Sequence, residues 1–550
     1  MVRRGSIRGL LGAFVLLTAL LPLSGASAAK PISNASRTLN LSLPGPFNGC
    51  TFLDTNATAT TDAVADLLLP SAFQTTGAGS LIGEGGAIAS AELTSLTPET
   101  IRYTIAPHEH WSNGNTFNGN DLVGWWLRAK ALRSIQSDGY RAIKSLTVSN
   151  SGLTVTAIFA TPYADWNLLF RDVEELGTQG GCSMAELMAR PTLGPYTLFS
   201  ATPSRMVLLE KKNWPIDANR FGRIVIADNG VIPTSAGSHF VSFSNIVNRS
   251  IVQTVSSHPT VLSHIGASSN VEEISFAAAR PFTRRIAVRR ALSWAINRQS
   301  LINLLWGAVT FSPSVAASAI YSQGQSNYPG QNGTTPTGQG ATTTTVPSTA
   351  TNGLADCLSC ASTELSMNGF LRTAHGWNTI RGAPLVLTLA VGPSNLDQTV
   401  AASLVQQWNS IGVKVARVNV RTEIAAAVAT ATNSDDMALF SRPTITAASY
   451  AARSWSGQGF ADTFPSSWRS VAATKLFTQG TSNFNPVTAS STWLKLDQMV
   501  QDGFWVRPLF TSPSLVEWSN SLVGLLGSFS VAGLVDQEPG WTTVSLPTKG

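Results

Sequence analysis

The sequence predicts an α/β protein with more than one domain. Its 550 residues exceed what a single hydrophobic core usually organises. Helix and strand patterns alternate along the chain and do not form separate blocks, which is typical of mixed architectures. Residues 383–420 carry the clearest unit: a strand "APLVLTLAV", a helix "NLDQTVAASLVQQWNSIG" ending at Gly412, and an alternating strand "VKVARVNV". Glycine is the preferred residue just after a helix, so this stretch predicts strand, helix, strand.

The N-terminus indicates export. Arg3, Arg4 and Arg8 precede the apolar run "GLLGAFVLLTALLPLSG", and the small residues "ASA" follow at 26–28. This order is typical of a secretory signal peptide, so we expect cleavage after Ala28 and a mature chain in the periplasm or on the outer face of the cell envelope. The alternative is an uncleaved membrane anchor, which the short run and its internal proline disfavour. No cysteine follows the run, so the usual lipoprotein attachment point is missing.

Composition narrows the class further. Apolar residues make up 43% of the chain and charged residues only 12%, which excludes a disordered protein. Without residues 1–28 the net charge falls from +6 to +3, because three arginines lie in that segment. A chain of this size and charge has no general electrostatic reason to bind nucleic acid.

Four cysteines are present, Cys50, Cys182, Cys357 and Cys360. An even number in an exported chain suggests disulfides. The sequence does not fix the pairing; Cys50 with Cys182 and Cys357 with Cys360 is the simplest arrangement. The C-x-x-C spacing also fits half a zinc site or a redox motif, but a second ligand pair and a βαβ context are both lacking.

Residues 321–356 form a low-complexity segment rich in Gly, Ser, Thr, Pro and Gln. Such a composition buries too little apolar surface to offset the entropy of ordering, so we expect a surface loop there.

Catalytic and metal-binding motifs are absent from the sequence. We find no G-x-S-x-G, no H-E-x-x-H and no phosphate-binding loop. His108 and His110 would share one face of a strand, but no further ligand cluster follows. The pairs Glu174–Glu175 and Asp435–Asp436 point apart as sequence neighbours, and we expect both to be solvated. The protein is therefore not expected to be an enzyme or to need a cofactor or metal.

The stretch 281–308 carries five arginines. Wound as a helix, residues 286–296 place their apolar side chains within one arc, with Arg285, Arg289 and Arg290 on the opposite side. We therefore expect a packed helix whose arginines form a solvated exterior face, although an anion site stays open as the alternative.

This stretch resembles the "PF-x-D-x-x-VRxALxxAIDR" segment of the family 5 extracellular solute-binding proteins, the peptide- and nickel-type receptors of ABC importers. The matching residues are Pro281, Phe282, Val288, Arg289, Ala291, Leu292, Ala295, Ile296 and Arg298, with Asn297 in place of the usual Asp. Four more segments are similar to the family's motifs, in the same order: 52–73 (Leu53, Asp54), 102–123 (Tyr103, Thr104, Trp111, Ser112, Gly114, Phe117, Asp121, Val123), 193–215 (Gly194, Pro195, Tyr196, Leu209, Asn213, Trp214) and 387–420.

The resemblance implies a two-lobed periplasmic-binding-protein fold (type II, cluster C-like) with an inserted subdomain. Ligand would bind in a hinged cleft between the lobes. The implied domains are a signal peptide at 1–28, lobe I from 29–62, 193–275 and 505–550, a subdomain inserted in lobe I at 63–192, and lobe II at 276–504, with 321–356 as its low-complexity loop.

One position departs from the family's pattern. Peptide-binding members have an aspartate, just after a strand of lobe II, that receives the peptide's α-ammonium group. Here residues 436–439 match that strand, but the chain continues "FSRPTITAASY", with Arg442 and no acid. A buried ammonium group without a carboxylate would be costly, whereas an arginine facing the cleft would favour a carboxylate. The alternative is that Arg442 points to solvent.

The expected function is that of an ABC importer's substrate-binding protein, a monomer that captures a small molecule or peptide and delivers it to a membrane permease. A ligand sensor of the same fold is the alternative, because the acid and the lipid anchor are missing; an exported hydrolase is disfavoured by the absent motifs. The expected ligand-binding residues are Asp54, Thr55, Phe440, Ser441, Arg442 and Trp455.

Overall fold

The structure is a computed structural model of the 550-residue chain. It describes residues 37–45, 47–50, 59–76, 81–132, 137–178, 181–212, 214, 220–228, 239–244, 247, 251, 253, 260–307, 313–321, 323, 325, 327–329, 357–443, 447–455, 467–525, 534–535 and 541–543. The expected signal peptide and most of the low-complexity segment lie outside these residues.

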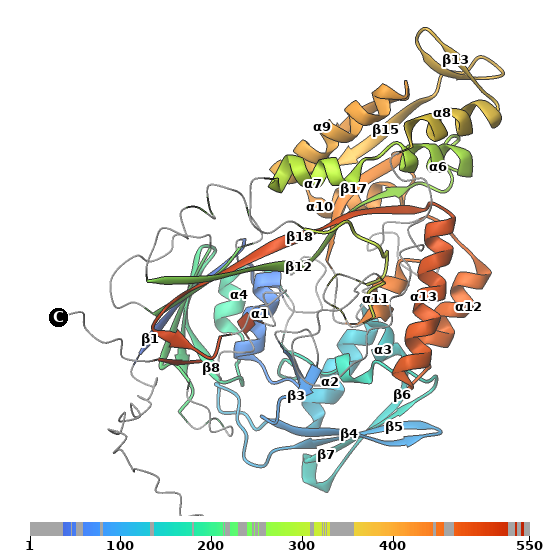
Figure 1. The fold of residues 1–550 in the computed structure, drawn as a ribbon. Coiled ribbons are helices and arrows are strands. Elements are labelled where there is room, and N and C mark those ends of the chain that lie inside the picture. The colour runs from blue at the N-terminus through green and yellow to red at the C-terminus, as the bar shows by residue number, and fades with distance from the viewer. Residues whose placement is uncertain are drawn as a thin grey trace, which may run out of the picture.

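One ten-stranded mixed sheet runs through the whole molecule (Figure 1). Its strands, in spatial order, are β16 (Lys414–Asn419), β15 (Val386–Val391), β17 (Met437–Pro443), β12 (Val261–Phe276), β18 (Val506–Ser519), β11 (His239–Ser244), β1 (Thr38–Leu43), β10 (Arg223–Asp228), β9 (Arg205–Glu210) and β8 (Tyr196–Thr202). Shorter two-stranded sheets pair β2 (Phe73–Thr75) with β3 (Leu81–Gly83), β13 (Phe370–Thr373) with β14 (Gly376–Thr379), and β19 (Leu522–Val523) with β20 (Thr542–Thr543).

The two longest strands of this sheet join two lobes. The first half of β12 and the second half of β18 pair with each other beside β11, whereas the second half of β12 pairs with β17. β12 stays paired with β18 along its length, and a register shift between Ala267 and Val271 lies where β17 begins to pair with the other edge of β12. We call the part with β1 and β8–β11 lobe I and the part with β15–β17 lobe II. The predicted α/β, two-lobed fold is confirmed, while the exact domain boundaries stay predictions.

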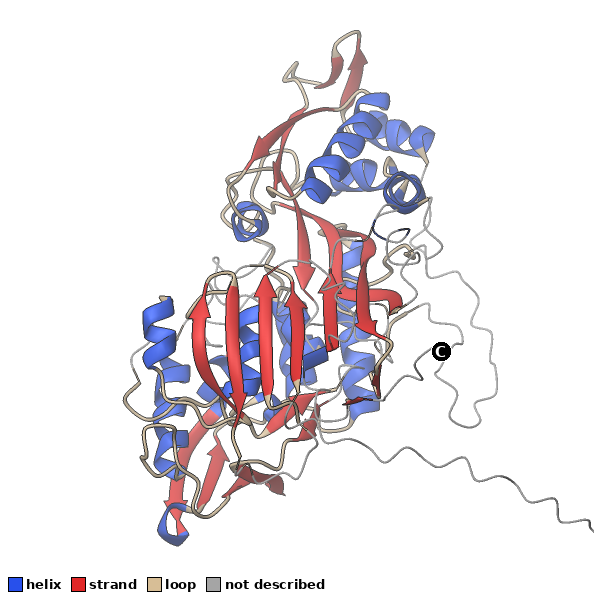
Figure 2. Cartoon of the chain, turned by 90° about the vertical axis from the view of Figure 1, so that its left-hand side faces the viewer, coloured by secondary structure: helices blue, strands red, loops and turns tan. Residues whose placement is uncertain are grey.

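Lobe I includes a smaller unit that we call the small subdomain. Its antiparallel sheet has the order β4 (Ile88–Leu96), β5 (Glu99–Ile105), β7 (Thr154–Phe159), β6 (Ile143–Ser149), and it packs against α2 (Gly119–Ala131) and α3 (Ser137–Ala142). The helices α1 (Ala59–Leu68) and α4 (Met184–Ala189) lie behind the lobe I strands (Figure 2). A single buried core continues from the lobe I strands into the small subdomain.

Lobe II has two cores on opposite faces of its strands. One packs side chains of β15 and β17 against α6 (Ile286–Trp294), α7 (Arg298–Trp306), α8 (Leu358–Met367) and α9 (Asn395–Ser410). On the other side lie α10 (Glu423–Ala429), α11 (Ala448–Arg453), α12 (Val471–Thr481) and α13 (Pro486–Asp502). Figure 1 shows α12 and α13 extending from lobe II down beside the small subdomain.

The predicted strand–helix–strand unit at 383–420 is confirmed as β15, α9 and β16, with the two strands parallel. Gly412 follows the helix with φ 75°, a left-handed conformation that glycine adopts without strain. Within the described ranges, the longest apolar helices fall short of what crossing a bilayer requires.

The exterior face expected for the arginines of α6 is wrong at one position. Arg289 is only 3% exposed. Its Nε and Nη2 donate to the Gly503 carbonyl at 2.9 and 2.7 Å, its Nη1 donates to the Thr283 carbonyl at 2.6 Å, and its guanidinium stacks over the Trp505 ring. The helical projection missed this because the turn after α13 covers the polar side of α6.

Three further arginines of this stretch, Arg285, Arg290 and Arg298, also have protein partners. Arg290 pairs with Glu364 of α8 at 3.0 Å, Arg285 donates to the Asn368 carbonyl, and Arg298 donates to the carbonyls of Ala316 and Pro508. The stretch therefore holds α6 and α7 to the surrounding segments of lobe II.

Candidate functional site

The strand β17, which carries three of the expected ligand residues, lies at the centre of lobe II. Its residues alternate between the two cores: Met437 and Leu439 face α9, whereas Ala438 and Phe440 face α10. Phe440 is 2% exposed and packs against alanines of α10 and β15. This burial makes Phe440 part of the packing under the site. Ser441, on the other face, is half-buried.

Arg442 neither points to solvent nor stands alone. It is 6% exposed, and its Nε donates to the Glu273 carboxylate of β12 at 3.0 Å. In the register of β12 and β17, Arg442 lies opposite Val271. Glu273 is two residues further along β12 on the same face, so the two strands place the ion pair side by side. Burial raises the pKa of Glu273, and the nearby Arg442 charge acts in the opposite direction. Among the described residues, the Nη1 and Nη2 atoms of Arg442 have no hydrogen-bond partner.

Trp455 lies at the end of α11 and is completely buried. Its ring belongs to a core formed by α11, α12, α13 and residues 319–328. Within the described part of the chain, its Nε1 donor is unpaired. Asp54 and Thr55, expected from the N-terminal loop, lie outside the described residues.

A buried carboxyl group of α13, that of Asp497, also lies near Arg442, and the sequence analysis did not single it out. Asp497 is 2% exposed and accepts the backbone N–H of Ala319 at 2.8 Å. Burial raises its pKa, and Arg442 lies close enough to lower it. The sequence does hold a signal for this residue: an aspartate on the apolar face of a helix, four residues after Trp493, needs a buried partner.

The start of the low-complexity segment is anchored. Tyr321 and Tyr328 are 4% and 7% exposed and belong to the same core as Trp455. The Tyr328 hydroxyl accepts the N–H of Ala317 at 2.7 Å. The prediction of a surface loop is therefore wrong at Tyr321 and Tyr328, because these two aromatic rings supply apolar area that the average composition of the segment hides. Residues 330–356 lie outside the described residues.

A second buried polar cluster lies where α1 meets the small subdomain. Asp66 forms an ion pair with Arg171 at 3.0 Å, and Glu84 accepts the backbone N–H of Ser71 at 2.7 Å. Burial, together with the neighbouring Asp66 charge, raises the pKa of Asp62 to about 8. Burial likewise raises the pKa of Glu84 to about 8. Asp62 and Asp66 lie one turn apart on α1, and only the fold shows that Glu84 and the distant Arg171 join them.

Three of the four acidic residues predicted to be solvated, Glu174, Asp435 and Asp436, are buried instead. Glu175 is half-buried and accepts hydrogen bonds from the side chains of Asn113 and Asn115. Glu174 is 2% exposed and pairs with Arg128 and Arg190. Asp435 and Asp436 are 8% and 3% exposed. Asp436 accepts the N–H of Thr388 and pairs with Arg280 at 3.2 Å, which ties β17 to β15. These partners lie on distant segments of the chain, so they could not be recognised from the sequence.

The histidines at 108 and 110 do not form one face of a strand. His108 sits in a turn with φ 67°, and His110 makes only an isolated bridge to Thr116. Over the described ranges, no group of three or more His, Cys, Asp or Glu side chains is arranged to hold a metal ion.

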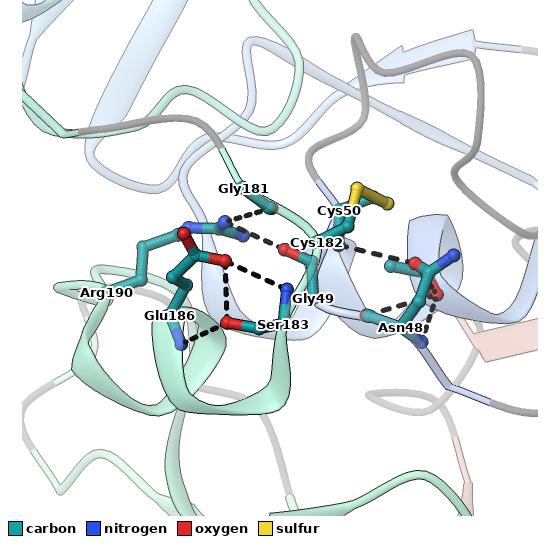
Figure 3. Close-up of a disulfide and its surroundings, with 9 residues drawn as sticks. Asn48, Gly49, Cys50, Gly181, Cys182, Ser183, Glu186 and Arg190 are labelled. Atoms are coloured by element: carbon teal, nitrogen blue, oxygen red, sulfur yellow. Dashed lines mark hydrogen bonds between the residues drawn. A yellow bond between two sulfur atoms is a disulfide. The ribbon is translucent and has the colours of Figure 1, made fainter.

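Both cysteine pairs are joined in the structure, Cys50 to Cys182 and Cys357 to Cys360, the pairing that is simplest from the sequence. Figure 3 shows the first pair, where Arg190 donates to the Gly49 and Gly181 carbonyls at 2.8 and 3.4 Å. A Cβ at Gly49 would lie 2.0 Å from the Ser183 carbonyl oxygen, so only glycine permits this close approach.

The family model for bacterial extracellular solute-binding proteins, family 5 (middle region), matches residues 86–469. The chain belongs to this family. Among curated relatives, the oligopeptide-binding protein OppA of Mycobacterium tuberculosis is 28% identical over 166 residues. The matched stretch covers 28% of this chain and 28% of that relative's own length. The probable monoacyl phosphatidylinositol tetramannoside-binding protein LpqW of the same species is 27% identical over 165 residues, which cover 28% of this chain and 26% of LpqW.

Solved structures of this fold superpose on nearly the whole chain. The periplasmic EDTA-binding protein EppA gives a TM-score of 0.76 at 16% identity and covers 94% of this chain and 98% of its own. The oligopeptide-binding protein AppA of Bacillus subtilis, in complex with a nonapeptide, gives 0.70 at 13% identity and covers 94% and 100%. NikZ of Campylobacter jejuni, in complex with Ni(L-His), gives 0.69 at 13% identity and covers 93% and 100%. At these identities the likeness establishes the fold.

Proposed function

We propose that this family 5 protein is the extracytoplasmic substrate-binding protein of an ABC importer. It captures a small solute, a peptide or peptide-like molecule, between its lobes and delivers it to a membrane permease. It works as a monomer in the periplasm or on the outer face of the cell envelope, without catalysis. The proposed ligand-binding residues are those expected from the sequence, Asp54, Thr55, Phe440, Ser441, Arg442 and Trp455, with the buried Phe440 supporting the others through its packing.

The observation that carries this proposal is the pair of continuous strands β12 and β18. Each contributes one half to the lobe I sheet and the other half to the lobe II sheet, with a register shift between Ala267 and Val271. Connections of this kind let two rigid bodies rotate about a few backbone positions. A ligand that touches both lobes would then favour the closed form.

A second candidate function is ligand sensing, or another non-transport role, in the cell envelope. It is favoured by the described part of β17, which offers Arg442 and no acid between Met437 and Pro443. The similarity to LpqW, a probable monoacyl phosphatidylinositol tetramannoside-binding protein, supports keeping this candidate. The fold alone does not select between transport and sensing. Solved proteins of this fold bind ligands as different as a nonapeptide and Ni(L-His).

The test is to purify the exported chain under native conditions and identify any bound solute by native mass spectrometry. Transport function predicts a solute or peptide in the cleft, contraction in small-angle scattering when it binds, and loss of its uptake when the gene is deleted. Binding and contraction with normal uptake after deletion would support the sensor. Absence of both a carried solute and contraction with a peptide and metabolite panel would reject solute capture.

A further inference from the structure

We infer that lobe II receives a carboxylate group of the ligand through Arg442. The inference rests on the proposed solute-binding function and deepens it, since it names the chemical class of the ligand. It is carried by the hydrogen-bonding state of three buried side chains, Arg442, Glu273 and Trp455.

The guanidinium of Arg442 is only partly satisfied by the protein. Arginine stays charged at any physiological pH and offers five N–H donors. Glu273 takes the Nε donor at 3.0 Å, and both side chains are at least 94% buried, with exposed fractions of 6% and 0%. The Nη1 and Nη2 atoms are buried without a partner among the described residues. A buried donor left without an acceptor is unfavourable, so acceptor oxygens are expected at this end.

The arrangement of the free donors selects the acceptor. With Nε occupied, Nη1 and Nη2 present two parallel N–H groups, the geometry that binds both oxygens of one carboxylate. The remaining oxygen of Glu273, Oε1, is also buried and unpaired in the described structure, and it can accept an N–H from the ligand. A carboxylate adjacent to an amide N–H meets both needs. This combination occurs at the C-terminal residue of a peptide and in N-acylated amino acids.

The surrounding groups permit an anion here. Asp497, the next carboxyl along, already accepts the N–H of Ala319, and burial shifts its pKa upward, toward the neutral form. Trp455 belongs to the same buried core as Ala319. Its indole Nε1 adds one more donor that has no partner among the described residues. In this region the unmet donors, three N–H-bearing nitrogens, outnumber the unmet acceptor oxygen of Glu273. A ligand rich in acceptors therefore fits better than an ammonium group.

The experiment compares end-modified ligands on the unaltered protein. A panel of tri- to pentapeptides and N-acetyl amino acids is screened by calorimetry, and the tightest binder is resynthesised with an amidated C-terminus and, separately, with an acetylated N-terminus. We expect amidation to raise Kd at least tenfold and acetylation to change it less than threefold. Equal affinity of the free acid and the amide, or stronger dependence on the free amine, would overturn the inference.

Variants test whether Arg442 is the receptor. Arg442→Gln should weaken the free-acid peptide at least tenfold while leaving the amidated peptide within threefold. Arg442→Lys, which keeps the charge and the Glu273 partner but loses the paired donors, should fall between. Arg290→Gln, which alters an arginine of α6 that pairs with Glu364, is the matched control and should change neither Kd. Equal weakening of both peptides in Arg442→Gln would indicate a structural role and reject the inference.

A panel without any binder would reject this ligand class while leaving solute capture itself open to the separate mass-spectrometric test. A different solute found in the native protein would support solute capture alone. The two proposals can therefore fail independently.

Discussion

The guanidinium of Arg453 in α11 forms an ion pair with the carboxylate of Asp138 in α3, so lobe II and the small subdomain touch directly. Arg453 also stacks over the Phe477 ring of α12. Nearby, the N–H of Ala164 donates to the Thr481 carbonyl at 2.7 Å. These contacts join the small subdomain to lobe II, so opening of the lobes would have to break them.

Replacing Arg453 with Gln should therefore loosen the closed form. The side chain is about nine-tenths buried, and hydrogen bonds to charged groups contribute about 2 kcal/mol each. We expect an apparent Kd for ligand at least tenfold weaker, together with a larger radius of gyration of the unliganded protein in small-angle scattering.

The matched control for Arg453→Gln is Arg141→Gln. Arg141 binds the same aspartate at 2.9 Å, but from within α3 and with 35% of its side chain exposed. Exposed pairs contribute about 0–1 kcal/mol, so this variant should leave both the radius and the Kd unchanged. Identical behaviour of the two variants would show that the contact between lobe II and the small subdomain has no part in closure.

The buried carboxyls beside α1 predict how stability changes with pH. The pKa of Asp62 and that of Glu84 are both raised to about 8, whereas unfolded carboxyls titrate near 4. Between these values the folded protein binds more protons than the unfolded chain. The free energy of unfolding should therefore fall as pH rises from about 4 to about 8, and level off above.

Thermal unfolding between pH 6.5 and 8.5 measures this effect. Burial lowers the pKa of His239 in the folded protein, whereas an unfolded histidine titrates near 6.5. Its opposite contribution to the slope therefore fades above about pH 7.5. Asp62→Asn should reduce the slope, because it removes one of the buried carboxyls that take up a proton on folding. Glu92→Gln, at a carboxyl whose side chain is 53% exposed, should leave the slope as it is. A wild-type Tm that rises with pH over this range would contradict the prediction.

The secondary structure was readable from the sequence where periodicity is strong, as in β15, α9 and β16. The sequence did not indicate which polar side chains are buried or which residues they contact. Arg289 lies on the polar arc of its helix, yet the turn at Gly503, more than 200 residues away, covers it. Asp62 and Glu84 become a cluster only when α1 packs against the small subdomain. Amphipathic patterns report an element's own faces, whereas burial of a charge depends on which distant segment packs over it.

Arg289 and Arg290 are adjacent in sequence and differ in burial, which gives a direct comparison. Arg289→Gln removes three charge-assisted bonds to backbone carbonyls. Since hydrogen bonds to charged groups contribute about 1.5–3 kcal/mol each, and part of the loss is recovered by the amide, we expect about 3 kcal/mol of destabilisation. Arg290→Gln breaks one pair whose arginine is 33% exposed, and should cost less than about 1 kcal/mol.

Urea unfolding of both arginine variants, followed by tryptophan fluorescence, gives the two free energies. Burial also lowers the pKa of Arg289 to about 9, below that of an unfolded arginine. Above about pH 9 the unfolded chain therefore binds more protons than the folded protein, so the wild-type advantage over Arg289→Gln should grow there. Equal costs for the two variants would mean that the carbonyl contacts at Gly503 and Thr283 contribute no net stability.

The two disulfides should differ in their effect on stability, because they close loops of very different length. Cys50 and Cys182 are 132 residues apart, whereas Cys357 and Cys360 are three apart. In the chain-entropy description, the long loop contributes about 5 kcal/mol and the short one about 2 kcal/mol. The double variant Cys50→Ser/Cys182→Ser should therefore show a larger decrease in Tm than Cys357→Ser/Cys360→Ser.

The Cys50–Cys182 disulfide also keeps Gly49 close to Ser183, and Arg190 donates to the Gly49 carbonyl there (Figure 3). A larger loss from the C-x-x-C variant would show that local helix capping at α8, where Cys357 accepts the Cys360 N–H, outweighs loop closure.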